Sequence, residues 1–351
     1  MSKIKRIFPE QLPLPVFDPF VFTMYHEDKY PAATSDMTPA TSKGQGIEWN
    51  MYYGETIPGF PVHPHRGFET LTVVEKGMID HTDGLGTKGR YGDGDVQWMT
   101  AGRGLQHAEM FPLLQEQGDN TLKMFQIWVN LPHSHKMVEP NYKMIWNEEV
   151  PVVTREENGA KTSVRVITGT FEGVRAPSST PDSWAYDPAH HVGVFVVTLD
   201  PKAKVSFPAV SPTLSRMIYA FDGGGAIDLD GHTLPFKHMA HLDGNAPIEV
   251  TNKEDNPVRF ILMEGEPINE NVVARGPFVM NTMEEILQAY HDYRQTEFGG
   301  WPHDRPDPVL GKNEGRYILD AQGNKTLPPK KKTSTSGPFT QKEKEPISNP
   351  R

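Results

Sequence analysis

Short apolar runs interrupted by Gly, Pro, Asp and Asn recur along most of the chain. β-Branched and aromatic residues dominate these runs, and frequent turn residues between them are typical of sandwiches and barrels rather than helix bundles. The pattern therefore predicts an all-β protein. Examples from both halves of the chain are FETLTVVEKG, GDGDVQWMTAG, NTLKMFQIWVNLP, KTSVRVITGT, HVGVFVVTLD and SRMIYAFDGGGAIDL.

The second half of the chain repeats the first in outline. LSRMIYAFDGG corresponds to FETLTVVEKG, and NPVRFILMEGEP corresponds to LKMFQIWVNLP. A repeat of this kind indicates two copies of one structural unit, and a chain of 351 residues has room for about two domains. We therefore expect two stacked β-barrels, in residues 1–150 and 151–300, with a single large sandwich as the alternative.

One helix is predicted near the end of this region, in NTMEEILQAYHDYRQ. Thr282 is a candidate N-cap, and Glu285 follows it at the spacing of a capping box. His291 is expected at the surface or the core edge of this helix rather than as a ligand. Helical periodicity places four residues on one packing face, namely Ile286, Ala289, Tyr290 and Tyr293.

Apolar periodicity fades beyond Pro306. The sequence LPPKKKTSTSGPFTQKEKEPISNPR is rich in Pro, Ser, Thr and Lys, a composition that buries too little surface to order itself. We expect residues 301–351 to form a polar, flexible tail. Lys330–Lys332 are at most a weak nuclear address, because lysines in a polar tail are usually solvated.

Charge and composition exclude several classes of function. The 45 acidic residues against 35 Lys and Arg give a formal net charge of −10, which disfavours binding to phosphate backbones and anionic lipids. The absence of Cys excludes disulfides, thiolate zinc sites and Cys nucleophiles. Prolines interrupt the N-terminal segment before a signal peptide develops, and no run approaches about 18 apolar residues. We expect a cytoplasmic protein without direct nucleic-acid or membrane partners, with a nuclear location as the eukaryotic alternative.

Two pairs of alternating polar residues form a candidate metal site. His63 and His65 lie where a strand begins, and His107 and Glu109 follow a glycine-rich turn. Residues i and i+2 of a strand project from one face, about 6.5 Å apart at Cα. Two strands that meet inside a barrel would present three imidazoles and one carboxylate to one ion. This ligand set favours Fe(II), Mn or Ni, with Zn and Cu as alternatives. Histidines satisfied by ordinary hydrogen bonds are the competing interpretation.

Four ordered motifs resemble the hallmark segments of the pirin family, within the cupin superfamily. They are HPHRGFETLTVVEKG, GDVQWMTAGRGLQHAEM, WVNLPHSHKMVEPNY and GPFVMNTMEEILQAYHDY. The resemblance spans roughly Phe17 to Gly300. It implies a bicupin: two cupin barrels of the double-stranded β-helix or jelly-roll type, packed face to face, with metal in the N-terminal barrel alone.

The resemblance also implies a ligand set for one Fe(II) or similar ion. Its members are His63, His65, His107 and Glu109. Glu69 occupies the position at which generic cupins have a glutamate ligand. The pirin family resembles a variant of the cupin site in which the glutamate of the HAE motif, here Glu109, binds the metal instead. We expect Glu69 outside the ligand set, either supporting the ligands or paired with Arg66 or Arg103.

The second half lacks an HxH pair before SRMIYAFDGG, so we expect its barrel to hold no metal. A cryptic second site is the alternative, in the stretch GHTLPFKHMAHLDG. Its candidate ligands are His232, His238 and His241.

The family resemblance implies a quercetinase-type dioxygenase that opens the heterocycle of a flavonol with O2. The metal would act as a Lewis acid, and Glu109 would accept the substrate's hydroxyl proton. A flat aromatic substrate requires apolar walls, and Trp98 and Phe68 are better explained as barrel core than as walls. The candidate walls are Phe60, Phe68, Trp98, Met99, Met110 and Phe111.

Two other functions remain open at this point. This chain also resembles eukaryotic pirins, and that resemblance implies an iron-dependent, redox-sensing transcriptional co-regulator that does not act as an enzyme. The acidic charge of this chain fits binding to protein partners rather than direct reading of DNA. The other is an interaction with a metabolic enzyme, in which the metal is structural.

Overall fold

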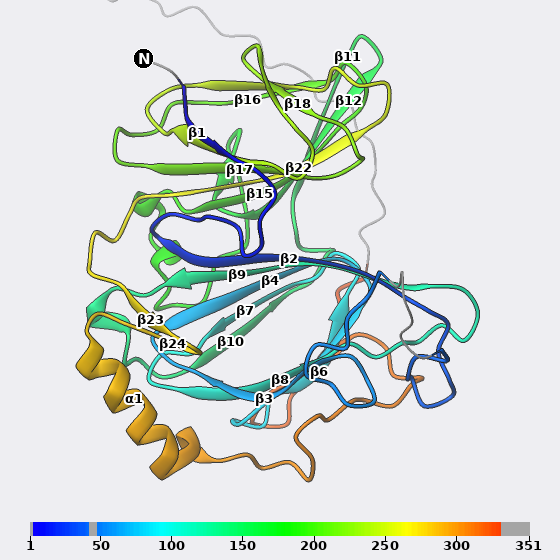
Figure 1. The fold of residues 1–351 in the computed structure, drawn as a ribbon, viewed down its shortest axis with the longest axis vertical. Helices are drawn as coiled ribbons and strands as arrows, with labels where there is room; N and C mark the ends of the chain where they lie inside the picture. The colour runs from blue at the N-terminus through cyan, green and yellow to red at the C-terminus, as the bar shows by residue number, and fades with distance from the viewer. Residues whose placement is uncertain (1–2, 42–47, 331–351) are drawn as a thin grey trace, which may run out of the picture.

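The computed structural model describes residues 3–41 and 48–330. It contains two β-barrels stacked one on the other, each made of two sheets (Figure 1). The expectation of an all-β protein with two barrels is therefore confirmed. No described helix is both long enough and apolar enough to cross a membrane.

The first barrel combines a five-stranded and a six-stranded sheet. The strands of the five-stranded sheet, in spatial order, are β10 (Asn141–Ile145), β7 (Val96–Thr100), β4 (Phe68–Lys76), β9 (Asn120–Asn130) and β2 (Phe20–Tyr30). Those of the six-stranded sheet are β26 (Lys325–Thr326), β25 (Tyr317–Leu319), β6 (Lys88–Gly92), β5 (Met78–Asp83), β8 (Leu105–Met110) and β3 (Gly59–His65).

The second barrel combines a seven-stranded and a four-stranded sheet. The strands of the seven-stranded sheet, in spatial order, are β1 (Ile4–Phe8), β20 (Met239–Asp243), β17 (Ser215–Asp222), β22 (Val258–Gly265), β15 (Gly193–Leu199), β12 (Ala160–Thr168) and β11 (Val152–Glu157). Those of the four-stranded sheet are β16 (Lys204–Phe207), β21 (Ile248–Thr251), β18 (Ile227–Leu229) and β19 (His232–Leu234). Two short hairpins complete the strands: β13 (Thr170–Phe171) with β14 (Val174–Arg175), and β23 (Val273–Arg275) with β24 (Phe278–Met280).

The strands between the barrels are apolar on both faces because both faces are covered. On β9, Phe125 and Ile127 belong to the cluster that joins the barrels, whereas Met124 packs inside the first barrel. On β15, Val194 joins the same inter-barrel cluster, and Phe195 points into the core of the second barrel. Successive residues of a strand point to opposite faces, so a continuous apolar run is what a strand buried on both sides requires.

The predicted helix is confirmed as α1 (Met283–Thr296). The Thr282 side chain accepts a hydrogen bond from the Glu285 amide, and the Glu285 side chain accepts one from the Thr282 amide, which completes the capping box. Ile286 and Ala289 are buried, and His291 is exposed, as expected. The helix packs on β23 and β24 beside the first barrel (Figure 1).

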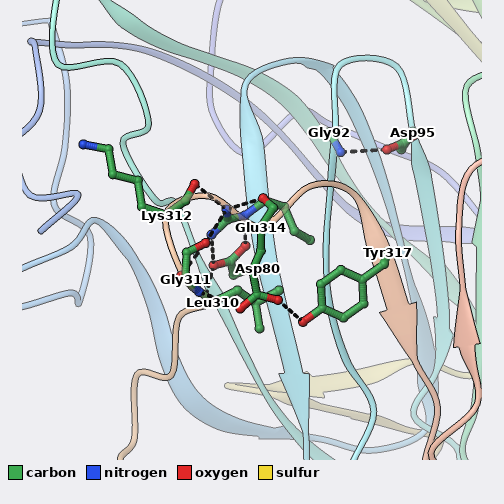
Figure 2. Close-up of polar contacts among 9 residues, drawn as sticks. Asp80, Gly92, Asp95, Leu310, Gly311, Lys312, Glu314 and Tyr317 are labelled. Atoms are coloured by element: carbon green, nitrogen blue, oxygen red, sulfur yellow. Dashed lines mark hydrogen bonds and ion pairs between the residues drawn. The ribbon is translucent and has the colours of Figure 1, made fainter. Parts of the chain in front are cut away.

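The expectation of a flexible tail is wrong for residues 301–330. β25 pairs with β6, and the barrel side chain Arg90 is buried beneath this segment. The Arg90 guanidinium donates to the Asp80 carboxylate at 2.7 and 2.8 Å. It also donates to backbone carbonyls of the segment, which Figure 2 shows gathered near Asp80: Leu310, Gly311, Lys312 and Glu314. These polar contacts, together with the burial of Ile318 in the core of the first barrel, fix this segment. Lys331, Lys332 and the rest of the predicted tail lie outside the described residues.

The chain also departs from a linear division at residue 150. β1 pairs with β20 in the second barrel, although the rest of the N-terminal region builds the first. Conversely, α1 contacts the first barrel, where Asp292 on the helix pairs with Arg66 at 2.7 Å. Each barrel thus holds a segment from the other end of the sequence.

Candidate metal centre

The antiparallel pairing of β3 with β8 brings the predicted histidines together. His63 lies opposite His107 in the register, and His65 lies two residues along the same strand. The ring centroids of His63 and His107 are 4.4 Å apart, and those of His65 and His107 are 4.9 Å apart. One nitrogen from each of the three rings lies within 4.8 Å of the others. Three imidazoles therefore converge on one point inside the first barrel.

Hydrogen bonds to backbone carbonyls set the tautomers of two of these rings. His63 Nδ1 lies 2.8 Å from the Pro61 carbonyl oxygen, and His65 Nδ1 lies 3.3 Å from that of Pro277. A carbonyl oxygen only accepts, so each Nδ1 carries the proton and each Nε2 keeps its lone pair. This arrangement is typical of metal-binding histidines.

Several nitrogen atoms of the cluster are buried without a partner. His65 Nε2 and both ring nitrogens of His107 make no hydrogen bond within residues 3–41 and 48–330. Buried polar atoms are nearly always satisfied, so histidines held by ordinary hydrogen bonds do not explain the cluster. A bound cation would satisfy His65 Nε2 and one nitrogen of His107, and the residues fit such an ion.

The rings are in the protonation state that a metal requires. Burial lowers the pKa of His63 and holds the pKa values of His65 and His107 well below their usual range. The neighbouring histidines act in the same direction, because a second positive charge would repel the first. Neutral imidazoles are the form that binds metal, so no proton has to be removed at neutral pH.

Glu109 lies beside the three histidines but is held by other side chains. Its Oε2 is 3.9 Å from His107 Nε2, and it does not belong to the group of mutually close ligand atoms. The Gln126 amide donates to Oε2 at 3.0 Å, and the Gln97 amide donates to Oε1 at 3.2 Å. Burial raises the pKa of the Glu109 carboxyl. Glu109 is thus a neighbour of the histidine cluster, and its carboxyl group holds a proton more readily than an exposed carboxyl does.

Sequence reasoning missed His81 and Asp83. β5 pairs with the other edge of β8, so that His81 lies opposite Glu109 and Asp83 opposite His107. His81 Nε2 is 3.3 Å from the Asp83 carboxylate, and the His81 ring centroid is 5.6 Å from that of His107. The alternation in MIDHTD was the available signal, since His81 and Asp83 share a strand face.

Glu69 faces away from the histidine cluster, and its expected pairing with an arginine is wrong. Trp98 Nε1 and the hydroxyls of Thr100 and Thr180 donate to its Oε1 at 3.1, 2.7 and 2.9 Å. Thr180 belongs to the second half of the chain, so Glu69 lies between the barrels. The reason is strand alternation: Glu69 shares a face of β4 with Leu71 and Val73, both in the inter-barrel cluster.

The two arginines proposed for Glu69 have other partners. Arg66 pairs with Asp292 at 2.7 Å and donates from Nε to the Arg103 carbonyl at 2.6 Å. Arg103 pairs with Glu139 at 2.8 Å. Burial raises the pKa of Glu69 to about 7, because no cation offsets the desolvation of its charge.

His63 and His65 line a cavity of about 1460 Å³. Of the six predicted apolar walls, only Phe60 contributes to it; the others are buried in the cores, as expected for Trp98 and Phe68. The remaining walls come from β2, β9, the loop before β3 and the C-terminal segment. Their aromatic members are Phe22, Tyr52, Tyr53 and Trp128.

The C-terminal segment forms part of the cavity rim. The Val62 amide donates to the Pro306 carbonyl at 2.7 Å, which fixes the segment beside β3. Arg305 and Asp307 both line the cavity and pair with each other at 2.7 Å. The part of the chain that was expected to be a tail thus closes one side of the cavity.

The three histidines of the proposed cryptic second site each have different surroundings. His238 Nδ1 lies 3.0 Å from the Phe236 carbonyl oxygen, His241 stacks on Phe17 with ring centroids 3.9 Å apart, and His232 is exposed. The group of three candidate ligands found in the described part of the chain is the one in the first barrel.

Comparison with known proteins identifies the family. The model of the Pirin family matches residues 2–129, and that of the Pirin C-terminal cupin domain matches residues 194–299. A pirin-like protein of Solanum lycopersicum is 40% identical over 237 residues, which cover 67% of this chain and 75% of the relative. Pirin of Homo sapiens is 39% identical over 254 residues, which cover 72% of this chain and 81% of the relative.

A solved structure agrees with this result. The crystal structure of quercetin 2,3-dioxygenase from Acinetobacter baumannii aligns with a TM-score of 0.67 and 27% identity, covering 86% of this chain and 99% of that one. GK1651 from Geobacillus kaustophilus aligns with a TM-score of 0.53 and 28% identity, covering 77% of this chain and 98% of that one. With its two stacked barrels and both family matches, this chain belongs to the pirin family and is a bicupin.

Proposed function

We propose that this protein is a metal-dependent dioxygenase that opens the heterocyclic ring of flavonols with O2. The observation that carries the proposal is the convergence of three neutral histidines, two of which, His63 and His65, line a cavity with aromatic walls. The structural similarity to a quercetin 2,3-dioxygenase supports the same reaction class. The cavity of about 1460 Å³ exceeds the roughly 300–1,000 Å³ of common ligand sites, so it admits a flavonol together with water.

His63, His65 and His107 would hold the metal, with Glu109 as the fourth ligand. Imidazole with one carboxylate and no thiolate suits Fe(II), with Mn, Ni, Zn or Cu as alternatives. When bound, the ion supplies Lewis acidity toward the oxygen atoms of the flavonol. The Nδ1 hydrogen bonds to Pro61 and Pro277 keep the rings of His63 and His65 oriented toward the common point.

Glu109 is the proposed proton acceptor for the 3-hydroxyl group of the substrate. Burial raises the pKa of this carboxyl, so it holds a transferred proton more readily than an exposed carboxylate does. Gln97 and Gln126 orient its two oxygens by donating hydrogen bonds to them. The two amides can keep donating these hydrogen bonds when Glu109 takes up the proton and its carboxylate becomes neutral.

The cavity walls bind and orient the rest of the substrate. Trp128 and Phe60 offer flat apolar faces, and both contact a histidine of the cluster: the Trp128 ring centroid lies 5.4 Å from that of His65, and that of Phe60 lies 6.3 Å from that of His63. A planar aromatic molecule stacked on these faces excludes water from the reacting end.

Anaerobic reconstitution with Fe(II), followed by quercetin and air, tests the proposal. The expected result is loss of the flavonol absorbance with matching consumption of O2, and none of either with His107→Ala. A Tyr186→Phe control alters an exposed aromatic residue of the second barrel and should react like the wild type. Unchanged absorbance from protein with bound iron would contradict the dioxygenase and leave the non-enzymatic co-regulator as the hypothesis to pursue.

A further inference from the structure

The wall of the metal cavity carries a second polar group, built by Asp28, Tyr52 and His26. Asp28 and His26 lie on β2, and Tyr52 lies in the loop that precedes β3. His26 and Tyr52 both line the cavity. Tyr52 adopts a left-handed backbone conformation with φ 55°, which is an outlier for a bulky side chain. The fold accepts this conformation and thereby places the Tyr52 hydroxyl between the other two side chains.

The directions of the hydrogen bonds in this group follow from its chemistry. The Tyr52 hydroxyl donates its one proton to Asp28 Oδ2 at 2.6 Å. Asp28 Oδ1 accepts from the Asn50 amide nitrogens of backbone and side chain, at 2.8 and 3.1 Å. His26 Nδ1 lies 2.8 Å from the same Tyr52 oxygen. Since the hydroxyl proton is already committed to Asp28, His26 Nδ1 must carry the proton of this contact.

A neutral His26 therefore has an unprotonated Nε2, which is buried in the wall that His26 contributes to the cavity. Burial lowers the pKa of His26 to about 4, so the ring is neutral at pH 7. His26 is 5% exposed, and its Nε2 makes no hydrogen bond with any residue of 3–41 or 48–330. The Gln126 side chain comes close enough to oppose the effect of burial on the pKa, but not in hydrogen-bonding geometry. A buried acceptor without a donor is costly.

The ring of Phe60 lies near both His26 and the histidine cluster. Its centroid is 5.9 Å from that of His26 and 6.3 Å from that of His63. A ligand that stacks on Phe60 would thus extend from the histidine cluster toward His26. The missing donor would come from such a ligand.

We propose that His26 Nε2 is a specificity-determining acceptor for a ring hydroxyl of the ligand that does not bind the metal. The inference rests on the proposed function and names the substrate class more closely: flavonols with additional phenolic hydroxyl groups. Asp28 and Tyr52 are positioning residues, because they fix the tautomer of His26 without facing the hydroxyl. A site built to accept such a donor discriminates against ligands that lack it.

Binding to Zn(II)-loaded protein without O2 tests the proposal, because Zn(II) has no redox chemistry. Quercetin carries the ring hydroxyls, whereas 3-hydroxyflavone keeps only the 3-hydroxyl and 4-carbonyl groups. Both are titrated by fluorescence against wild type, His26→Asn and His26→Gln. Asn retains a polar atom near Nδ1 and has none near Nε2, whereas Gln places an amide oxygen near Nε2.

We expect His26→Asn to weaken quercetin binding about tenfold and to leave 3-hydroxyflavone binding within about twofold. His26→Gln should restore most of the preference for quercetin. Equal losses for both ligands, or no loss for either, would overturn the role of His26 while the proposed function stands. If the wild type binds neither ligand, the proposed function fails, and this inference fails with it.

The tautomer of His26 gives a second readout that does not depend on a stable variant. ¹⁵N NMR of histidine-labelled protein separates protonated from unprotonated ring nitrogens. The His26 resonances should show Nδ1 protonated and Nε2 unprotonated, and the Nε2 resonance should shift with quercetin but not with 3-hydroxyflavone. Tyr52→Phe should release the tautomer preference. A protonated Nε2 in the free wild type would overturn the proposal.

Discussion

The two barrels share an architecture but differ in what fills them. The interior of the second barrel is a continuous apolar cluster that includes Phe195, Phe260 and Leu262. In the first barrel, an apolar cluster around Tyr91 and Trp146 fills only part of the interior. The rest holds the cluster of three histidines, of which His65 and His107 have unsatisfied nitrogens, and an open cavity. One barrel is therefore packed for stability, and the other leaves polar groups unsatisfied, which is expected where a site binds a ligand.

The largest stability effect is expected in the packed barrel. Phe260 is fully buried in its core, so Phe260→Ala removes a large side chain and leaves a cavity. We expect it to lower the free energy of unfolding by about 3–5 kcal/mol, measured by denaturant titration. A loss below about 1 kcal/mol would show that the second barrel is not the well-packed partner.

Satisfied polar groups in the first barrel should also matter for stability. Arg90→Met leaves the buried Asp80 carboxylate without its arginine partner and removes the donors to residues 310–314. Breaking a buried pair by removing one partner costs about 3 kcal/mol or more. We expect a loss of this size in urea titrations, together with faster proteolysis of the segment after residue 300. The exposed Arg155→Met is the matched control and should change neither quantity.

Between the barrels, Glu69 makes stability depend on pH. Its pKa is raised to about 7 in the folded protein against 4.5 as the ordinary value, so the native state binds more protons than the unfolded state between these limits. Stability therefore falls as pH rises from about 4.5 to 7 and stays lower above that. Glu69→Gln should stabilise the protein at pH 8 by up to about 3 kcal/mol, and this gain should shrink toward pH 5. A gain that does not vary with pH would contradict this account.

The smallest stability effect should come from a ligand of the proposed metal. His107 is fully buried but makes no hydrogen bond within the described chain. His107→Ala removes an unsatisfied polar group as well as packing, and the two effects oppose each other. We expect the metal-free variant to unfold within about 1 kcal/mol of the metal-free wild type in guanidinium titrations. A loss as large as that of Phe260→Ala would show that His107 is a core residue rather than part of a binding site.

Local patterns in the sequence were sufficient to predict the strands, the helix and the two pairs of candidate ligands. Alternation placed His63 and His65 on one strand face, and the capping box located α1. These features depend on residues that are close in sequence. The pairing of β3 with β8, which brings the two halves of the cluster together, was only a condition of the spacing argument, and its register comes from the structure.

What the sequence did not reveal depends on contacts between distant segments. Residues 310–314 are ordered by Arg90, which lies more than 200 positions earlier. Glu69 finds Thr180 across the barrel interface, and Tyr52 reaches His26 from a loop. Hydrogen bonds of this kind leave no periodic signal, because a single donor and acceptor carry each of them.

The central claim is that the three converging histidines of the first barrel bind one metal ion. The direct test is the ratio of iron to protein after anaerobic loading with Fe(II) and removal of free metal, for wild type and His107→Ala. We predict close to one ion per chain for the wild type and almost none for the variant, because one of three converging imidazoles is gone. Equal iron contents in the two proteins would contradict the claim.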